Sequence, residues 1–278
     1  MKKEEKEELL EYLIQFLNIE KQFPLLPGVS DKSAVAGFIG IDEDELDTIR
    51  ANFDQNTRQA AFELLKEEEV QKQIDKLPFK KNDKIAIIGD AVTDDLQSWF
   101  FILKHALELS IEAANFSWYD ASQSSETSAN ILMRLDRDVL AYKPDWVIIA
   151  IGSDEAVRPH LATARTLVSL AEFWENVNTI ESAIQLVVKN PVIWITPPPP
   201  VTELMQQHPF FNGVAYEEDL KQYREVIAGK QGYIVDPAGV RMGNPPEAWN
   251  FLSDGYHHSL AGHLNTVRTL IEVLGRGK

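Results

Sequence analysis

The sequence predicts an α/β fold in which a parallel sheet carries helices on both faces. Two observations lead to this prediction. From residue 84 onward, short apolar runs alternate with amphipathic segments of helical period. The runs are apolar throughout, which is typical of strands that helices cover on both sides. Five strands are expected, at residues 84–90, 113–120, 145–152, 191–198 and 232–237.

The helices of this alternation are expected between and after the strands. Their ranges are 96–109, 127–142, 171–189, 217–228 and 260–275. In parallel sheets of this kind, functional residues gather at the carboxyl ends of the strands, where the informative residues of this chain also stand.

Residues 1–80 are expected to form a helical N-terminal extension, and residues 81–278 the α/β domain. Leu and Ile recur at helical spacing near the N-terminus, residues 42–53 begin with acids suited to a helix start, and residues 56–77 form an amphipathic stretch. Residues 23–38 contain Pro and Gly and are expected to be a loop. We expect the extension to pack on the α/β domain, with a subunit contact as the alternative.

Composition excludes several classes of function. The 278 residues carry a formal charge of −16, which disfavours nucleic acid and anionic membranes as partners. The chain contains no cysteine, so thiolate catalysis, disulfides and cysteine-type zinc sites are excluded. No signal peptide and no apolar run of about 18 residues is evident, so a cytoplasmic protein is expected.

The first expected strand ends in the turn Gly89–Asp90–Ala91, which leads into Thr93 and Asp94. Enzymes often place a nucleophile in a strand–turn–helix of this shape, yet the methyl group of Ala91 cannot attack a substrate. The alternative is a helix start in which Asp90 or Thr93 acts as the cap.

Further polar residues follow the second and third strands. The loop at residues 120–127 offers backbone amides for an anion, or a helix cap through Ser124 or Ser125. Asp154 and Glu155 end the third strand. Because a buried charge without a partner is costly, we expect both in a cleft rather than in the core.

The stretch at residues 254–263 is the most specific one. Asp254 precedes His257 by three residues, so its carboxylate can bind Nδ1 and leave Nε2 free as a general base. The alternative is a surface turn. His258 and His263 are expected to be structural or exposed.

Four segments (85–99, 119–129, 143–156 and 252–263) resemble, in order and spacing, the sequence blocks of the SGNH or GDSL-type hydrolases. The resemblance implies a three-layer α/β/α sandwich with a five-stranded parallel sheet, the flavodoxin-like SGNH fold. It also implies ester hydrolysis by a Ser-His-Asp triad without a metal or cofactor. Small acyl or acetylated carbohydrate esters are the implied ligands.

The same resemblance assigns site positions residue by residue. The nucleophile falls on Ala91, while His257 is the base and Asp254 orients it. The oxyanion-hole positions are Ala91, Ser122, where the family has glycine, and Asp154, where the family has asparagine. Asp90, Thr93 and Asp94 support the turn.

Three function hypotheses follow from these residues. The first is an ester hydrolase scaffold that is inactive or weak because the nucleophile is missing; the second is a ligand-binding pseudo-hydrolase. The third is a metal-dependent hydrolase in which the strand-end carboxylates hold a metal. An ionised Asp154 would raise the pKa of His257 and oppose an oxyanion.

Overall fold

A five-stranded parallel sheet organises the chain in the computed structural model, which describes residues 3–111, 114–209, 211 and 213–277. The strands are β1 (Lys84–Gly89), β2 (Ser117–Asp120), β3 (Trp146–Ala150), β5 (Ile193–Ile195) and β7 (Tyr233–Val235). Their order is β2-β1-β3-β5-β7, and every neighbouring pair is parallel. The predicted fold class and all five predicted strands are confirmed, although the expected start of the second strand, residue 113, lies outside the described residues.

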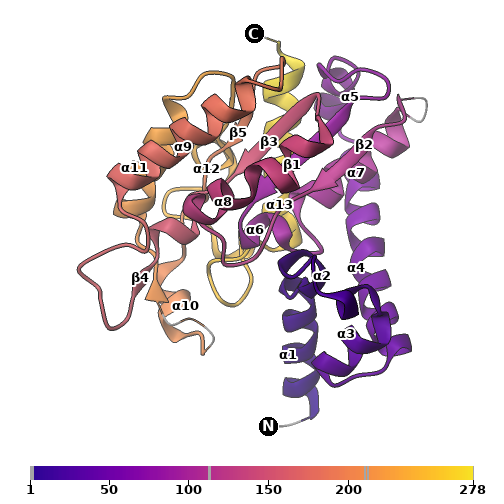
Figure 1. Ribbon diagram of the computed structural model, residues 1–278, viewed down its shortest axis with the longest axis vertical. Coiled ribbons are helices and arrows are strands. Elements are labelled where there is room, and N and C mark those ends of the chain that lie inside the picture. The colour runs from indigo at the N-terminus through magenta and orange to yellow at the C-terminus, as the bar shows by residue number, and fades with distance from the viewer. Residues whose placement is uncertain (1–2, 112–113, 210, 212, 278) are drawn as a thin grey trace.

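Helices cover both faces of this sheet (Figure 1). One face packs against α8 (Ser128–Asp138), α9 (Leu170–Gln185) and α11 (Glu217–Ala228). The other packs against α4 (Glu43–Leu64), α5 (Glu68–Ile74), α7 (Trp99–Ser110) and α13 (Leu260–Gly275). Alternate residues of β1 point to opposite faces of the sheet. Ile85 and Ile87 pack in the core with α7 and α13, and Ala86 and Ile88 pack in the core with α8 and α9. The three-layer arrangement is therefore built on strands with no polar face.

Short elements complete the described chain. They are α1 (Lys3–Phe16), α2 (Ile19–Gln22), η1 (Pro27–Ser30), α3 (Lys32–Ile39), α6 (Ala91–Asp94), η3 (Leu140–Tyr142), η4 (Asp154–Ala156), α10 (Thr202–Gln207), α12 (Pro237–Arg241) and η5 (Ala248–Asn250). Strands β4 (Arg158–Pro159) and β6 (Gly213–Val214) form a separate antiparallel pair.

One expectation for the N-terminal extension is wrong. Residues 23–38 are not all loop, because Asp31 accepts a hydrogen bond from the amide of Ser33 (3.0 Å) and starts helix α3. The acids at the start of residues 42–53 lead into α4, which ends at Leu64, and α5 begins at Glu68.

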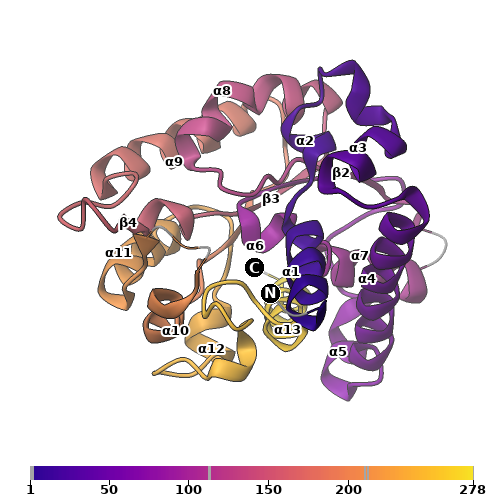
Figure 2. The same ribbon diagram turned by 90° about the horizontal axis from the view of Figure 1, so that it is seen from below.

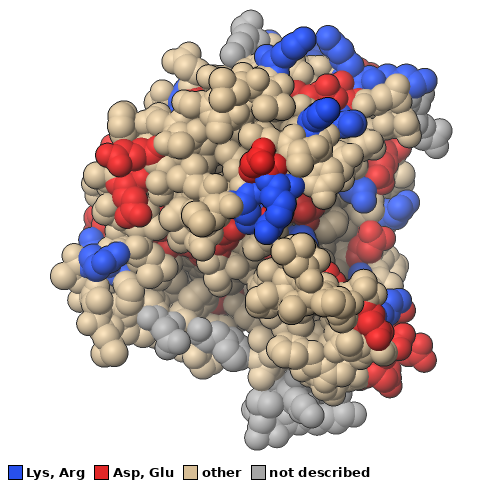
Figure 3. Space-filling view, viewed as in Figure 1, with Lys and Arg blue, Asp and Glu red and all other residues tan. Residues whose placement is uncertain are grey.

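The extension packs on the α/β domain. Ala60, Ala61 and Leu64 of α4 belong to the same core as α7 and α13, while α1, α3 and the first half of α4 enclose a smaller apolar cluster. Seen from below, α1 lies beside α6 and α13, at the carboxyl end of the sheet (Figure 2). On the face drawn in Figure 3, acidic and basic side chains are interspersed. None of the described helices is both long and apolar enough to cross a membrane.

Candidate active site

The turn after β1 has the geometry of a helix start. Asp90 caps α6 by accepting a hydrogen bond from the amide of Val92 (3.1 Å), and Ala91 is the first residue of that helix. Gly89 is needed here, because a Cβ on it would lie 2.3 Å from Oγ1 of Thr93. Ala91 is 6% exposed, so a side chain at this position is nearly enclosed. The helix start capped by Asp90, which the sequence offers as one of two alternatives, is therefore present.

Asp254 and His257 form the hydrogen-bonded pair that their spacing predicts. Oδ2 of Asp254 lies 2.9 Å from Nδ1 of His257, and Oδ1 accepts from the amides of Tyr256 and His257 (2.7 and 2.8 Å). Gly255 adopts φ +69° inside this turn, and a Cβ there would lie 2.5 Å from the carbonyl oxygen of Val201. Burial alone would raise the pKa of Asp254, but these hydrogen bonds and the nearby imidazole hold it below its ordinary value.

The amide of Ser122, expected to serve an oxyanion, is already engaged. It donates to Oδ1 of Asp120 (3.0 Å), and the Ser122 hydroxyl donates to the same oxygen. The amide at this position therefore faces a carboxylate of its own loop.

Asp154 stands next to the predicted dyad. Its Oδ1 accepts a hydrogen bond from the hydroxyl of Tyr256 (2.5 Å), and it is close enough to His257 for a direct charge interaction. Burial raises the pKa of Asp154, although Tyr256 and His257 act in the opposite direction. A larger share of Asp154 is therefore protonated at a given pH than of an exposed aspartate, and a neutral carboxyl opposes an oxyanion less than a carboxylate does.

Asp154 and Glu155, which we expected in a cleft rather than in the core, are both buried. Asp154 is 9% exposed and Glu155 is completely buried, where its Oε1 accepts from the amide of Ser128 at the start of α8 (2.6 Å). The N-terminus of α8 therefore provides a favourable partner for the buried carboxyl group of Glu155. Burial raises the pKa of Glu155 to about 7. Burial and the neighbouring Asp154 and Glu155 likewise raise the pKa of Asp90.

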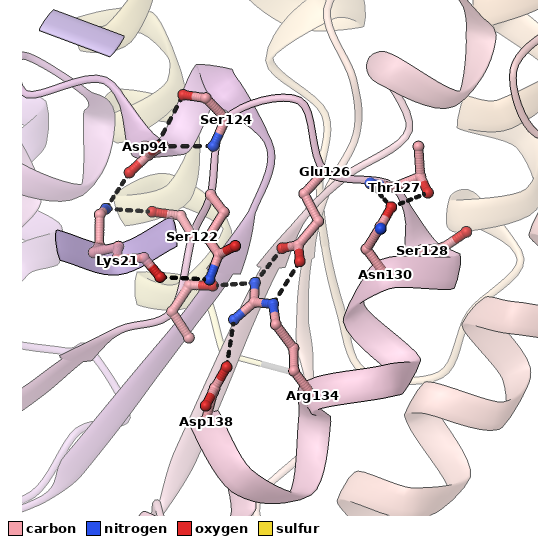
Figure 4. Close-up of polar contacts among 12 residues, drawn as sticks. Lys21, Asp94, Ser122, Ser124, Glu126, Thr127, Ser128, Asn130, Arg134 and Asp138 are labelled. Carbon is pink, nitrogen blue, oxygen red and sulfur yellow. Dashed lines mark hydrogen bonds and ion pairs between the residues drawn. The ribbon is translucent and has the colours of Figure 1, made fainter. Parts of the chain in front are cut away.

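Asp94 connects the turn to two distant segments (Figure 4). Its Oδ2 accepts from the amide and the hydroxyl of Ser124 (both 2.8 Å), which ties α6 to the loop after β2. Lys21 forms an ion pair with Asp94 and a second one with Asp120 (2.8 Å). Thr93 supports the turn in another way, by accepting from Nε1 of Trp99 (3.1 Å).

Glu126 and Arg134 hold the loop after β2 from its other end. The guanidinium of Arg134 binds both carboxylate oxygens of Glu126, and it also donates to the carbonyl of Ala121 (2.5 Å) (Figure 4). Thr127 and Asn130 form a capping box at the start of α8. The loop cap therefore involves Thr127, whereas Ser124, an expected cap, binds Asp94.

Sequence reasoning missed the residues of α1 that cover the dyad. The hydroxyl of Tyr12 donates to Oδ2 of Asp254 (2.9 Å), and the ring of Phe16 lies against the imidazole of His257 with centroids 4.1 Å apart. Phe211 stacks on the imidazole at 5.8 Å. The signal available in the sequence was a set of polar and aromatic residues within the apolar stripe of α1, among them Tyr12 and Gln15.

The remaining candidates are buried. His263 contacts Asp95 (3.1 Å) with both side chains fully buried, and burial lowers the pKa of His258 well below its ordinary value. Within the described ranges, no group of three or more histidine and acidic side chains is arranged to hold a metal ion. Asp90 accepts a hydrogen bond from the amide of Val92, and Asp254 binds His257.

A five-stranded parallel sheet with helices on both faces is the scaffold of an SGNH hydrolase. A model of the GDSL-like lipase/acylhydrolase family matches residues 87–264, which is well over half of the chain. The chain belongs to this family. None of the curated proteins matches it.

Solved structures show the same fold at low sequence identity. A catalytic mutant of Axe2, an acetylxylan esterase from Geobacillus stearothermophilus, is 20% identical with a TM-score of 0.59; the match covers 71% of this chain and 96% of Axe2. Another crystal structure of Axe2 gives a TM-score of 0.56 with the same identity and coverage. LAE5, an α/β hydrolase enzyme from the metagenome of Lake Arreo, Spain, is 21% identical with a TM-score of 0.58, over 71% of this chain and 97% of LAE5.

Proposed function

We propose that this chain is an ester hydrolase scaffold for small acyl or acetylated carbohydrate esters that hydrolyses them weakly or not at all. The observation that carries the proposal is Ala91 at the start of α6, in a chain that retains the hydrogen bond between Asp254 and His257. The acetylxylan esterase Axe2, which shares the fold, supports this class of ligand.

The roles of the residues follow from serine hydrolase chemistry. Asp254 fixes the tautomer of His257, whose Nε2 takes the proton of a nucleophilic hydroxyl. Ala91 offers no such hydroxyl, so the covalent acyl intermediate cannot form at this position. Any remaining rate comes from ligand binding and polarisation, which leave about 10³- to 10⁴-fold acceleration over water when a triad member is absent. No cofactor enters this chemistry.

Hydrolysis of p-nitrophenyl acetate by the unchanged chain and by Ala91→Ser tests the proposal. We expect a rate near background for the unchanged chain and a measurable increase for Ala91→Ser that His257→Ala removes. Substantial hydrolysis by the unchanged chain that survives His257→Ala contradicts the proposal.

A second candidate function is ligand binding without catalysis. It is favoured by Ser122, whose amide is bound to Asp120 and not free for an oxyanion. Binding does not need the attacking atom, and a ligand at 100 times its Kd stabilises the folded chain by about 2.7 kcal/mol. A thermal-shift screen with acetylated sugars and short esters checks this function; no shift across the panel counts against it.

The proposal also includes a domain boundary, a class of ligand and a cellular location. We place the boundary between the helical extension and the hydrolase domain at residue 80, and the family match that begins at residue 87 supports this division. The acidic surface supports a small-molecule ligand over nucleic acid or a membrane. The absence of cysteine supports a cytoplasmic location.

A further inference from the structure

Helix α1 lies directly on the Asp254–His257 pair. The hydroxyl of Tyr12 donates to Oδ2 of Asp254 at 2.9 Å and stands 3.2 Å from Nδ1 of His257. The ring of Phe16 covers the imidazole at a centroid distance of 4.1 Å and an interplanar angle of 34°. Phe16 is 9% exposed and His257 is 7% exposed, so the contact is closed to solvent.

The residues that follow on the same segment bind the turn after β1. Nε2 of Gln15 lies 2.8 Å from both carboxylate oxygens of Asp95. Nδ2 of Asn18 donates to Oδ1 and to the carbonyl oxygen of Asp94, each at 2.8 Å. Gln15 and Phe16 follow Tyr12 by three and four residues, so the three share one helix face. This face contacts both the Asp254–His257 pair and the turn after β1.

Lys21 contacts the loop after β2, which carries Ser122. Its ammonium group lies between Asp94 and Asp120, and it stands 3.2 Å from the hydroxyl of Ser122 (Figure 4). Burial alone would lower the pKa of Lys21, but Asp120 and Asp94 hold it above its ordinary value. Residues 12–21 therefore reach the dyad, the nucleophile turn and an oxyanion-hole position.

Hydrogen bonds to backbone carbonyls fix the position of this segment. The hydroxyl of Ser124 donates to the carbonyl of Phe16 (2.8 Å), and Nε2 of Gln123 donates to the carbonyl of Lys21 (2.9 Å). The amide of Leu96 donates to the carbonyl of Gln15 (3.1 Å). The loop after β2 and the loop after α6 thus donate hydrogen bonds to backbone carbonyls of this segment, as a binding site does to a bound peptide.

We propose that the surface around Asp254 and His257 that α1 covers is a peptide-binding site and that residues 12–21 are its resident, displaceable ligand. The ligand class is an amphipathic helix with an aromatic pair four residues apart, followed by an asparagine and a lysine. An isolated helix as short as α1 is only marginally stable in water, so undocking favours its unfolding and exposes His257. Tethering to the chain keeps the ligand at an effective concentration in the millimolar range.

This inference goes beyond the proposed function, although both concern Asp254 and His257. The experiments that test it use a peptide and a histidine reagent and no ester. Failure of the ester proposal therefore leaves this inference standing, and the reverse also holds.

Competition with a synthetic peptide is the first test. A fluorescein-labelled peptide of residues 9–22 is titrated with the full-length chain and with full-length Tyr12→Ala/Phe16→Ala, and anisotropy is measured. The resident helix competes in the unchanged chain, so we expect at least tenfold tighter binding to the variant. A matched peptide that carries Tyr12→Ala and Phe16→Ala should not bind. Equal affinities for the two folded chains, or binding of the matched peptide, overturn the proposal.

A disulfide lock is the second test, and it decides the matter if the first variant loses its fold. The amide of Leu96 donates to the carbonyl of Gln15 (3.1 Å), and the chain has no cysteine of its own, so the only intramolecular disulfide that Gln15→Cys/Leu96→Cys can form joins these two positions; formation of that bond is checked first by mass spectrometry. Diethyl pyrocarbonate modification of His257 is followed by mass spectrometry. We expect at least tenfold slower modification in the oxidised form than in the reduced form. Equal rates overturn the proposal, because α1 then never leaves the imidazole.

Discussion

The amide of Ser122 donates a hydrogen bond to the carboxylate of Asp120, at 3.0 Å. In a working oxyanion hole this amide would point at the ligand. Under the proposed function, the site departs from the hydrolase pattern at three positions: the amide of Ser122 is engaged, Ala91 lacks a hydroxyl, and Asp154 stands where the resemblance implies an asparagine. Each departure removes a different interaction, so each should respond to a different substitution.

Restoring the nucleophile alone should recover little activity. We expect Ala91→Ser to hydrolyse p-nitrophenyl acetate slowly, and Ala91→Ser/Asp154→Asn to be about 100-fold faster, because one oxyanion donor contributes about 10²- to 10³-fold. Asp154→Asn alone should stay at background, so the effects of the two changes are not additive. Full activity in Ala91→Ser alone contradicts this expectation.

Freeing the Ser122 amide should add a further increase. In the Ala91→Ser/Asp154→Asn chain, Asp120→Ala removes the acceptor of that amide, and we expect kcat to rise about tenfold. Asp120 also binds Lys21, so Lys21→Ala in the same background is the control that weakens the segment over the cleft without freeing the amide. A rise of equal size in the control shows that access to the cleft, and not the amide, limits the rate.

Much of the fold could be predicted from local patterns. The strands β1, β3 and β5 are nearly continuous apolar runs because helices cover both faces of the sheet there, and α11 and α13 have the predicted bounds. Helix α3 was missed because residues 23–38 contain two prolines and Gly28 ahead of the cap at Asp31, and Gly37 within the helix itself. The average composition of that segment does not reveal the position of the helix cap.

The site was predictable only in part, for a physical reason. Asp254 and His257 are three residues apart, so their spacing reveals the hydrogen bond. Tyr12 binds Asp254 across 242 positions of sequence, and no local pattern indicates such a contact. The same holds for Glu155, whose partner is the helix N-terminus at Ser128. Contacts between distant segments, which bury charges and cover catalytic positions, need the structure.

Lys21 should matter more to stability than a surface lysine. Lys21→Met keeps the methylene stem but leaves Asp94 buried without its ion pair, so we expect the free energy of unfolding to fall by about 1–3 kcal/mol. The matched control is Lys32→Met, which breaks an ion pair with Asp47 in which both side chains are about half exposed. That change should cost about 0.5 kcal/mol or less. Urea denaturation measures both, and equal losses contradict the prediction.

Glu155 should make the protein less stable as the pH rises through the weakly acidic range. In the unfolded chain a glutamic acid loses its proton near its ordinary pKa of 4.5, whereas burial raises the pKa of Glu155 in the folded chain to about 7. Between these two values the folded state binds more protons than the unfolded state, so the free energy of unfolding falls with increasing pH. A shift of this size corresponds to at most about 3 kcal/mol, which is lost fully once the pH exceeds the folded pKa.

Glu155→Gln removes this titration and keeps an oxygen that can accept from the amide of Ser128. Urea denaturation of the unchanged chain and of Glu155→Gln from pH 5 to pH 8 should show the variant gaining stability relative to the unchanged chain as the pH rises. Glu175→Gln on the exposed face of α9 is the matched control and should show a constant difference. A difference for Glu155→Gln that is equally constant across this range would mean that Glu155 is ionised throughout it, and that the start of α8 stabilises its carboxylate more than burial disfavours it.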